Sequence, residues 1–366
     1  MRLKLETRPE PSATMRYASP LVALVLTGLV GTALFIILGR SPLQAFEALF
    51  ITPVSSLAGL GELALKASPL MLIAMGLTVG FRASVWNIGA EGQLVAGAIV
   101  GGGLAVHFHG VQSGWLLPAM MFGGALGGAA WAAVPALLRT RFNANEILTS
   151  LMLTYVAQLA LSYLVYGPWR DPNGFNLPQT RMFDSSALFS ILIDETRMNT
   201  SLFVALAAVA LGWIFMSKSL LGYQMRVAGM SSAAASYAGI NARKTVWVGM
   251  LAGGVAAGLA GVGEVAGPIG QLLPVVSPGY GFAAIIVAFV GRLHPVGIVL
   301  ASLLMALLYL GGEAAQLNLN MPAAITGLFQ GILLFILLGT DVLVSYRIRI
   351  EFRRPRTGAA KQGVFA

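Results

Sequence analysis

The sequence has 366 residues, of which 57% are hydrophobic and only 10% charged, and its mean hydropathy is +0.79. Soluble domains carry about 25% charged residues, so this composition excludes a water-soluble fold and indicates a protein that crosses a membrane several times. The absence of cysteine excludes a disulfide framework, a thiolate metal site and a cysteine nucleophile. The net charge of +9 does not indicate nucleic-acid binding, because the basic residues lie beside apolar segments.

Apolar segments long enough for a membrane helix recur along the chain. A bilayer core about 30 Å thick needs roughly 20 mostly apolar residues per helix. The segments that meet this criterion lie near 20–39, 60–80, 93–107, 115–138, 147–167, 200–216, 246–266, 280–291, 296–312 and 322–339. We therefore expect an all-α fold, a polytopic bundle of about ten transmembrane helices. Glycine-rich runs at 97–103, 123–129 and 253–261 predict that several of these helices approach one another closely.

The distribution of basic residues predicts how the bundle is oriented. Cytoplasmic loops of membrane proteins carry the excess of Lys and Arg, and with both termini in the cytoplasm the outer loops contain only Arg40, Lys66, Arg170, Arg181 and Arg197. We expect a cytoplasmic N-terminal segment at 1–19, a transmembrane domain at 20–339 and a basic cytoplasmic tail at 340–366. The tail is expected to lie against membrane lipid rather than nucleic acid.

Two connections are longer than simple turns, and long loops are often functional. Residues 168–199 are polar and should form a periplasmic loop. Residues 217–245 are basic and alanine-rich and should form a cytoplasmic loop. Within the second loop, Ser232 is expected to cap a short helix, and Gly239 to end it in the left-handed conformation.

The sequence offers little that supports an enzyme. No lysine follows a glycine, so a phosphate-binding Walker A motif is absent. His107 and His109 are two residues apart and would point to different sides of a helix, and His294 lies in a turn. We therefore predict no catalytic residue, no metal site and no cofactor bound by this chain.

Acidic residues within the apolar pattern are functional candidates, because burying an ionisable group in a membrane is costly. Glu91, Glu146, Glu264 and Glu313 lie in or at the ends of apolar spans. The alternative to a functional role is a structural one, in which the acid forms a hydrogen bond between helices or lies at the membrane interface. For Glu146 and Glu313, the two roles are equally supported. For Glu91 and Glu264, the structural role is less supported than the functional one.

The most polar stretch inside the apolar pattern contains Asn87, Glu91 and Gln93 together with two glycines. This combination predicts a broken or re-entrant helix near 81–93, which is tolerated in a membrane where it lines a protein cavity. Such a group can hydrogen-bond a polyhydroxylated or heterocyclic solute. Trp86 can stack on a solute ring or lie at the level of the lipid headgroups.

Four segments carry a family resemblance. Residues 78–98 read TVGFRASVWNIGAEGQLVAGA, and residues 278–304 read PGYGFAAIIVAFVGRLHPVGIVLASLL. Together with 144–157 and 219–244, they resemble permease subunits of ATP-binding-cassette (ABC) importers for nucleosides and related simple sugars such as ribose. One departure is Thr154, where relatives often have Asn.

The resemblance implies a multi-pass permease domain in the bacterial cytoplasmic (inner) membrane, dimerised with a second permease subunit. It also implies ATPase subunits, which use ATP, and a solute-binding protein or lipoprotein. The predicted substrate pathway comprises Trp86, Asn87, Glu91, Gln93, Asn145, Glu146 and Glu264. The predicted ATPase-coupling residues are Gly222, Arg226, Gly229, Ala233, Ala234 and Gly239, within a coupling element at 219–241.

Nucleosides, free purines, ribose-like sugars and other small solutes all remain open as substrates. The alternative function is a proton-coupled secondary transporter of a small polar solute, in which Glu91 or Glu264 would carry the proton. An integral-membrane enzyme would need a nucleophile or a metal site that the sequence lacks.

Overall fold

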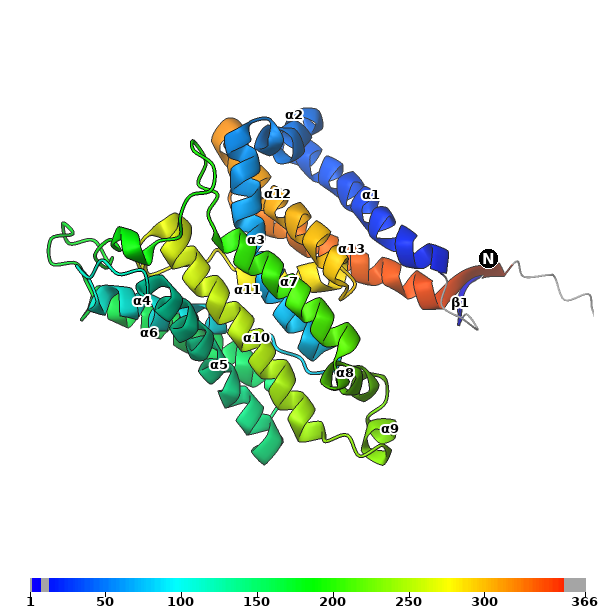
Figure 1. The fold of residues 1–366 in the computed structure, drawn as a ribbon. Helices are drawn as coiled ribbons and strands as arrows, with labels where there is room; N and C mark the ends of the chain where they lie inside the picture. Colours follow the sequence, from blue (N-terminus) through cyan, green and yellow to red (C-terminus); the bar gives the residue numbers. More distant parts are fainter. Residues whose placement is uncertain (1, 8–12, 352–366) are drawn as a thin grey trace, which may run out of the picture. The chain divides into compact units, whose positions relative to one another are not determined.

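The computed structural model describes residues 2–7 and 13–351. The chain divides into two units, one formed by residues 40–330 and the other by residues 1–39 together with 331–366. Helices make up almost all of the larger unit (Figure 1).

The larger unit contains the long helices that follow one another from residue 57 onward. Its elements are α2 (Pro42–Phe46), η1 (Glu47–Ile51), η2 (Thr52–Val54), α3 (Leu57–Phe81), α4 (Ala90–His107), α5 (Leu116–Phe142), α6 (Glu146–Tyr166), η3 (Ser185–Ala187), α7 (Ser201–Lys218), α8 (Leu220–Met230), α9 (Ser232–Tyr237), α10 (Ala242–Glu264), η4 (Val265–Ile269), α11 (Tyr280–Val290), α12 (Pro295–Leu319) and the first residues of α13 (Ala324–Ser345).

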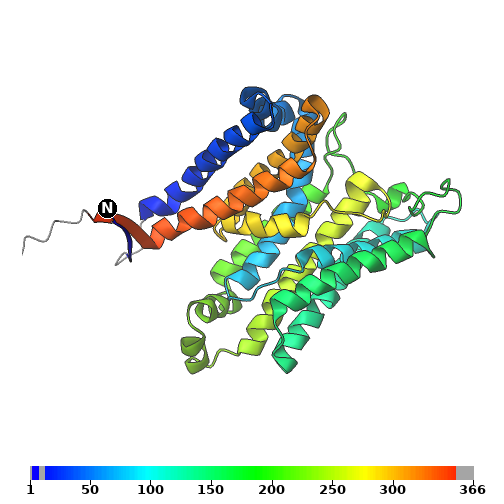
Figure 2. The same ribbon diagram turned by 180° about the vertical axis from the view of Figure 1, so that it is seen from behind.

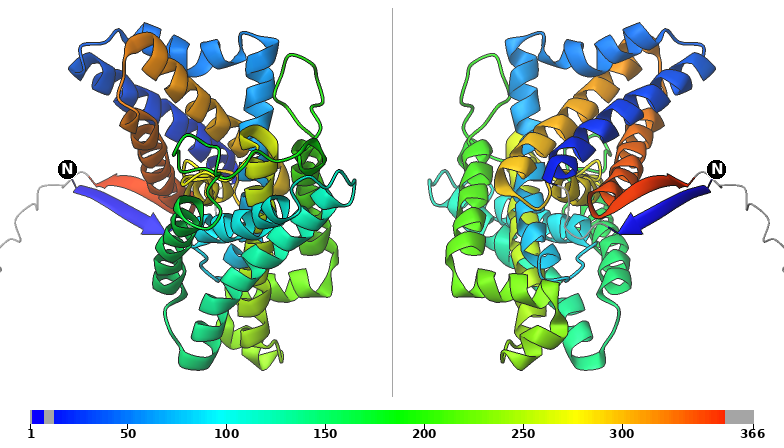
Figure 3. Two further views of the ribbon diagram at one scale, coloured as in Figure 1. Left: turned by 90° about the vertical axis from the view of Figure 1, so that its left-hand side faces the viewer. Right: turned by 90° about the vertical axis from the view of Figure 1, so that its right-hand side faces the viewer.

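The smaller unit joins the two ends of the chain. Strand β1 (Arg2–Thr7) pairs antiparallel with β2 (Tyr346–Glu351), as Figure 3 shows. The Thr340 hydroxyl of α13 donates to the backbone oxygen of Ser19 in α1 (Ala13–Ile37) at 3.3 Å. This strand pair is an addition to the all-α prediction.

The predicted terminal segments differ from the observed elements. Helix α1 begins at Ala13, inside the segment 1–19 that was predicted to precede the first span. Helix α13 extends to Ser345, into the predicted tail at 340–366, and residues 352–366 of that tail lie outside the described residues.

Each of the predicted spans coincides with a helix. Among the described residues, 6 helices are long and apolar enough to cross a membrane: Leu57–Phe81, Leu116–Phe142, Glu146–Tyr166, Ser201–Lys218, Ala242–Ile269 and Pro295–Leu319. Shorter apolar helices lie at Leu21–Ile37, Tyr280–Val290 and Gly327–Thr340. The protein is therefore a helical membrane protein with several spans.

The two predicted loops have different structures. The loop after α6 contains one short helix, η3, and an isolated bridge between Ile191 and Asn199. The second loop contains α8 and α9. The cap of α9 is Ser231, whose hydroxyl accepts the Ala234 N–H at 3.2 Å, so the prediction of Ser232 was wrong by one residue. Gly239 has φ +74° and ends the turn as predicted.

Helix α10 forms the centre of the larger unit and packs against α3, α4 and α5 (Figure 2). Its glycines allow this approach: a Cβ on Gly258 would overlap the carbonyl oxygen of Gly124 in α5, and a Cβ on Gly97 would overlap Gly258. Small residues are the usual means of close helix packing in membranes. The glycine-rich runs therefore have the packing role that the sequence predicted.

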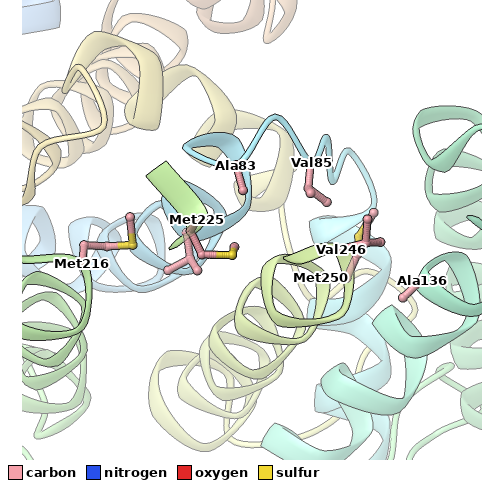
Figure 4. Packing of buried hydrophobic residues seen from close by; sticks show 8 residues of the cluster. Ala83, Val85, Ala136, Met216, Met225, Val246 and Met250 are labelled. Atoms are coloured by element: carbon pink, nitrogen blue, oxygen red, sulfur yellow. The ribbon is translucent and has the colours of Figure 1, made fainter. Parts of the chain in front are cut away.

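A buried apolar cluster joins α8 and α10 to the connection between α3 and α4 (Figure 4). Met225 of α8 and Met250 of α10 are fully buried in this cluster, together with Ala83 and Val85 of the connection. The cluster holds α8 against the bundle, because moving α8 away would expose these apolar side chains to water, which is unfavourable.

Candidate functional site

The predicted helix break is present, as a connection between two helices. Helix α3 ends at Phe81 and α4 begins at Ala90, and every second residue between them, from Ala83 to Gly89, is buried. The Asn87 and Gln93 side chains exchange two hydrogen bonds of 2.9 and 3.0 Å, and Asn87 also accepts the Gly89 N–H at 3.1 Å. Each amide thus provides a hydrogen-bond partner for the other, and together they fix the conformation of the connection.

Glu91 joins the beginning of α4 to the beginning of α11. Its Oε2 accepts the Gly281 N–H at 2.6 Å, and Ser277 and Gly279 interact with the same carboxylate. A carboxylate is stabilised at a helix N-terminus because the first N–H groups there lack partners within the helix. The approach requires a glycine, since a Cβ on Gly281 would overlap the Glu91 backbone.

A cavity of about 380 Å³ lies beside this contact. Its polar lining residues are Glu62, Lys66, Arg197, Glu264, Ser277 and Tyr280. They come from α3, the loop before α7, the end of α10 and the segment that leads into α11. We refer to this space as the outer cavity, because the predicted periplasmic loop contributes Arg197.

Most charges of the outer cavity are paired. Arg197 donates two hydrogen bonds to the Glu62 carboxylate, at 2.6 and 2.8 Å, and this interaction raises the pKa of Arg197. Lys66 forms an ion pair with Glu313 of α12 at 2.8 Å. Glu264 is 7% exposed and has no hydrogen bond or ion pair with the residues that the structure describes. One carboxylate therefore faces the cavity with its acceptor capacity unused.

The remaining predicted pathway residues are not among those that line the outer cavity. Trp86 stacks on Phe289, with ring centroids 5.8 Å apart and an interplanar angle of 17°. Asn145 caps α6 by accepting the Ile147 N–H at 2.9 Å. Glu146 is buried and forms an ion pair with Arg139 at the end of α5. Each of these side chains thus has a partner within the protein.

Sequence reasoning did not select Glu62, Lys66, Arg197 and Tyr280 as site residues. Glu62 and Lys66 are four residues apart, which places them on one face of α3, and this spacing was a usable signal. The position of Arg197 depends on the path of a long loop, and no sequence pattern predicts that path.

The predicted coupling residues have two different roles. Gly222 and Gly229 let α8 pack closely: a Cβ on Gly229 would overlap the Arg82 carbonyl oxygen, and one on Gly222 would overlap that of Phe215. The Ser84 hydroxyl also donates to the Gly229 oxygen at 3.3 Å.

Helix α9, in contrast, is mostly exposed. Ala233 and Ala234 are exposed, and Ala235 is buried. Tyr237 is 97% exposed and Met230, at the end of α8, is 87% exposed.

Comparison with known proteins identifies the family. Residues 59–338 match the permease component of branched-chain amino acid transport systems. The chain belongs to this family. A glucose ABC transporter permease protein of Haloferax volcanii is 34% identical over 97% of this chain and 95% of its own length.

Two relatives come from Lactococcus lactis, and both are nucleoside ABC transporter permease proteins. One is 28% identical over 95% of this chain and 96% of its own length. The other is 26% identical over 66% of this chain and 77% of its own length. These similarities confirm the resemblance found in the sequence.

Family membership establishes the general role of this permease. It is the permease subunit of an ABC transporter and a multi-pass protein of the cytoplasmic membrane. Such a subunit is not an enzyme, since the ATPase activity belongs to partner subunits, and a solute-binding partner is implied as well. The family thereby decides against the proton-coupled secondary transporter.

The contact between Glu91 and Gly281 yields a first prediction. In Glu91→Ala the buried Gly281 N–H loses its acceptor, which costs roughly 1–3 kcal/mol, so the thermal unfolding midpoint of the purified permease should fall. Glu91→Gln keeps an acceptor oxygen of similar reach and should lose clearly less stability. Equal midpoints for Glu91→Ala and the wild type would show that this bond does not stabilise the fold.

Proposed function

We propose that this permease imports nucleosides or related simple sugars across the cytoplasmic membrane. The observation that carries the proposal is the outer cavity, whose volume of about 380 Å³ lies in the usual range for small-molecule sites, roughly 300–1,000 Å³. We assign both termini to the cytoplasm and about ten helices to the membrane, following the charge distribution and the apolar segments.

The chemistry of the outer cavity favours a neutral, hydroxylated solute. The basic groups there are already paired with Glu62 and Glu313, so an anionic solute would have to displace a carboxylate. Glu264 offers carboxylate oxygens to hydroxyl donors. Tyr280 and Ser277 add hydroxyl groups to the same lining. A sugar ring, free or as part of a nucleoside, fits this set of partners.

The pathway continues inward from the outer cavity past Glu91 and the closed connection of Asn87 and Gln93. Glu91 contacts the same segment, 277–281, that lines the cavity. Opening this contact would separate α4 from α11. We assign Asn87, Glu91 and Gln93 to the inner boundary of the pathway on this basis.

The energy for transport comes from ATP used by partner subunits, and the chain itself binds no cofactor. A second permease subunit completes the membrane part. The two related permease proteins of Lactococcus lactis support such a pair. A solute-binding protein or lipoprotein delivers solute to the outer cavity.

Reconstitution tests the proposal directly. Proteoliposomes that contain the permease with its ATPase subunits and second permease should accumulate radiolabelled nucleoside or glucose when ATP is inside and the loaded binding protein outside. The permease alone should show neither ATP hydrolysis nor accumulation. Accumulation by the isolated chain under a pH gradient would refute the ABC-importer mechanism.

Glu264→Gln tests the role of the outer cavity. A hydrogen bond contributes about 0.5–1.5 kcal/mol, so uptake at limiting solute should fall by roughly twofold to tenfold while the amount of assembled complex is unchanged. Glu47→Gln is the matched control, because Glu47 is exposed and does not line the cavity. Wild-type uptake in Glu264→Gln would remove this residue from the pathway.

Helix α9 is proposed to contact the ATPase subunit. Its 6 residues are too few to form a stable isolated helix, and Ala234 and Tyr237 present an exposed surface. In Ala234→Trp, the large ring should weaken ATPase co-purification or uncouple hydrolysis from transport, and the docking of the binding protein outside should be retained.

Ala242→Trp is the control for this variant, since Ala242 is also exposed but belongs to the first turn of α10. Surface substitutions without a partner usually change stability by no more than about 0.5 kcal/mol. If Ala234→Trp gave wild-type co-purification and solute-stimulated hydrolysis, α9 would not be the coupling element.

A further inference from the structure

A second cavity, of about 90 Å³, lies at the opposite end of α3. It is formed where the ends of α3 and α7 meet α8 and the turn between α11 and α12. Its lining includes Arg82, Trp213, Ser217, Arg226, Leu293 and His294. We refer to it as the basic cavity, because none of the described residues that line it is acidic.

Two guanidinium groups, those of Arg82 and Arg226, line the basic cavity. Arg82 donates from Nε and one terminal nitrogen to the Leu293 carbonyl, at 3.1 and 2.6 Å. Its other terminal nitrogen has no hydrogen-bond partner among the described residues. Burial, and secondly repulsion from Arg226, lowers the pKa of Arg82. Two guanidinium groups that repel each other at one cavity are stabilised by an anion between them.

The surroundings of the basic cavity indicate where this anion comes from. Helix α7 contributes Trp213 and Ser217, and it is the least buried of the six candidate spans among the described residues. Trp213 is 51% exposed and lies in the C-terminal half of that helix, and tryptophan is enriched at the level of lipid headgroups. Basic pockets between membrane helices are known to bind the headgroups of anionic lipids.

We propose that the basic cavity binds the phosphate group of an anionic phospholipid, with Arg82 and Arg226 as its ligands and Trp213 beside the acyl chains. Arg226, which the sequence assigns to ATPase coupling, is among the residues that line this cavity. The site lies apart from the outer cavity and shares no lining residue with it.

Quenching of tryptophan fluorescence by brominated lipid tests the proposal on the purified full-length chain. Brominated phosphatidylglycerol or brominated phosphatidylcholine is titrated into mixed micelles. The signal of Trp213 is taken as the difference between the wild type and Trp213→Phe. Phosphatidylglycerol should quench Trp213 at lower mole fractions than phosphatidylcholine does. The measurement needs neither solute nor partner subunits, so its result is independent of the proposed transport function.

Arg226→Gln should raise the mole fraction of phosphatidylglycerol needed for half quenching about fivefold, as expected for one lost cation. It should leave quenching by phosphatidylcholine unchanged. Arg243→Gln is the matched control, because Arg243 is exposed on α10 and does not line the cavity. An equal effect of both variants would show diffuse attraction to the micelle and overturn the site.

Inorganic phosphate distinguishes the two possible sources of the anion. Added in excess over lipid, it should not displace brominated phosphatidylglycerol, because it lacks the acyl chains that lie beside Trp213. Displacement would assign the cavity to free phosphate and overturn the lipid proposal. Equal quenching by the two lipids in the wild type would overturn it as well, and would favour the ATPase as the partner of Arg226.

Discussion

The structure depends on one constraint: backbone that leaves the helical conformation inside a membrane protein must find its hydrogen-bond partners within the protein. In the connection between α3 and α4, the Gly89 N–H donates to Asn87 Oδ1 at 3.1 Å and the Val85 N–H donates to the Gly80 carbonyl at 3.0 Å. Pairing with the Gln93 amide holds the Asn87 side chain in place. At the far side of the connection, Glu91 accepts the N–H of Gly281 and so satisfies the start of a second helix, α11. The Glu91 carboxylate therefore links the two interrupted regions.

Close packing of α10 determines where the outer cavity can form. Because Gly258 allows α5 to approach and Gly253 lies against Asn87, α10 is held against both α5 and the connection. Its last residue, Glu264, then reaches the same space as Lys66 of α3. Lys66 lines the same cavity as Glu264 but pairs with Glu313 instead. Glu264 therefore lacks an ion-pair partner among the described residues because the neighbouring cation is paired with a different carboxylate.

Much of the fold could be predicted from the sequence, because apolar length and glycine spacing are local signals. The helices, the break near residue 87 and the left-handed Gly239 follow from such signals. The strand pair of the chain ends could not be predicted, since it joins residues more than 300 positions apart. The site was predicted in part: Glu91 and Glu264 stood out as acids in apolar segments. The partners of Glu91, and the pairing that leaves Glu264 free, depend on segments distant in the sequence.

The same contacts connect α9, the proposed coupling helix, to the proposed pathway. Helix α8 cannot move independently of the connection, because Gly229 lies directly against Arg82 and Met225 is buried beside Ala83 and Val85. Arg82 in turn holds the Leu293 carbonyl in the turn that follows α11. A displacement of α8 therefore acts on both sides of the Glu91 contact, through the start of α4 on one side and through α11 on the other. That contact consists of hydrogen bonds from segment 277–281 to one carboxylate, so a relative shift of the two helices would lengthen all of them together.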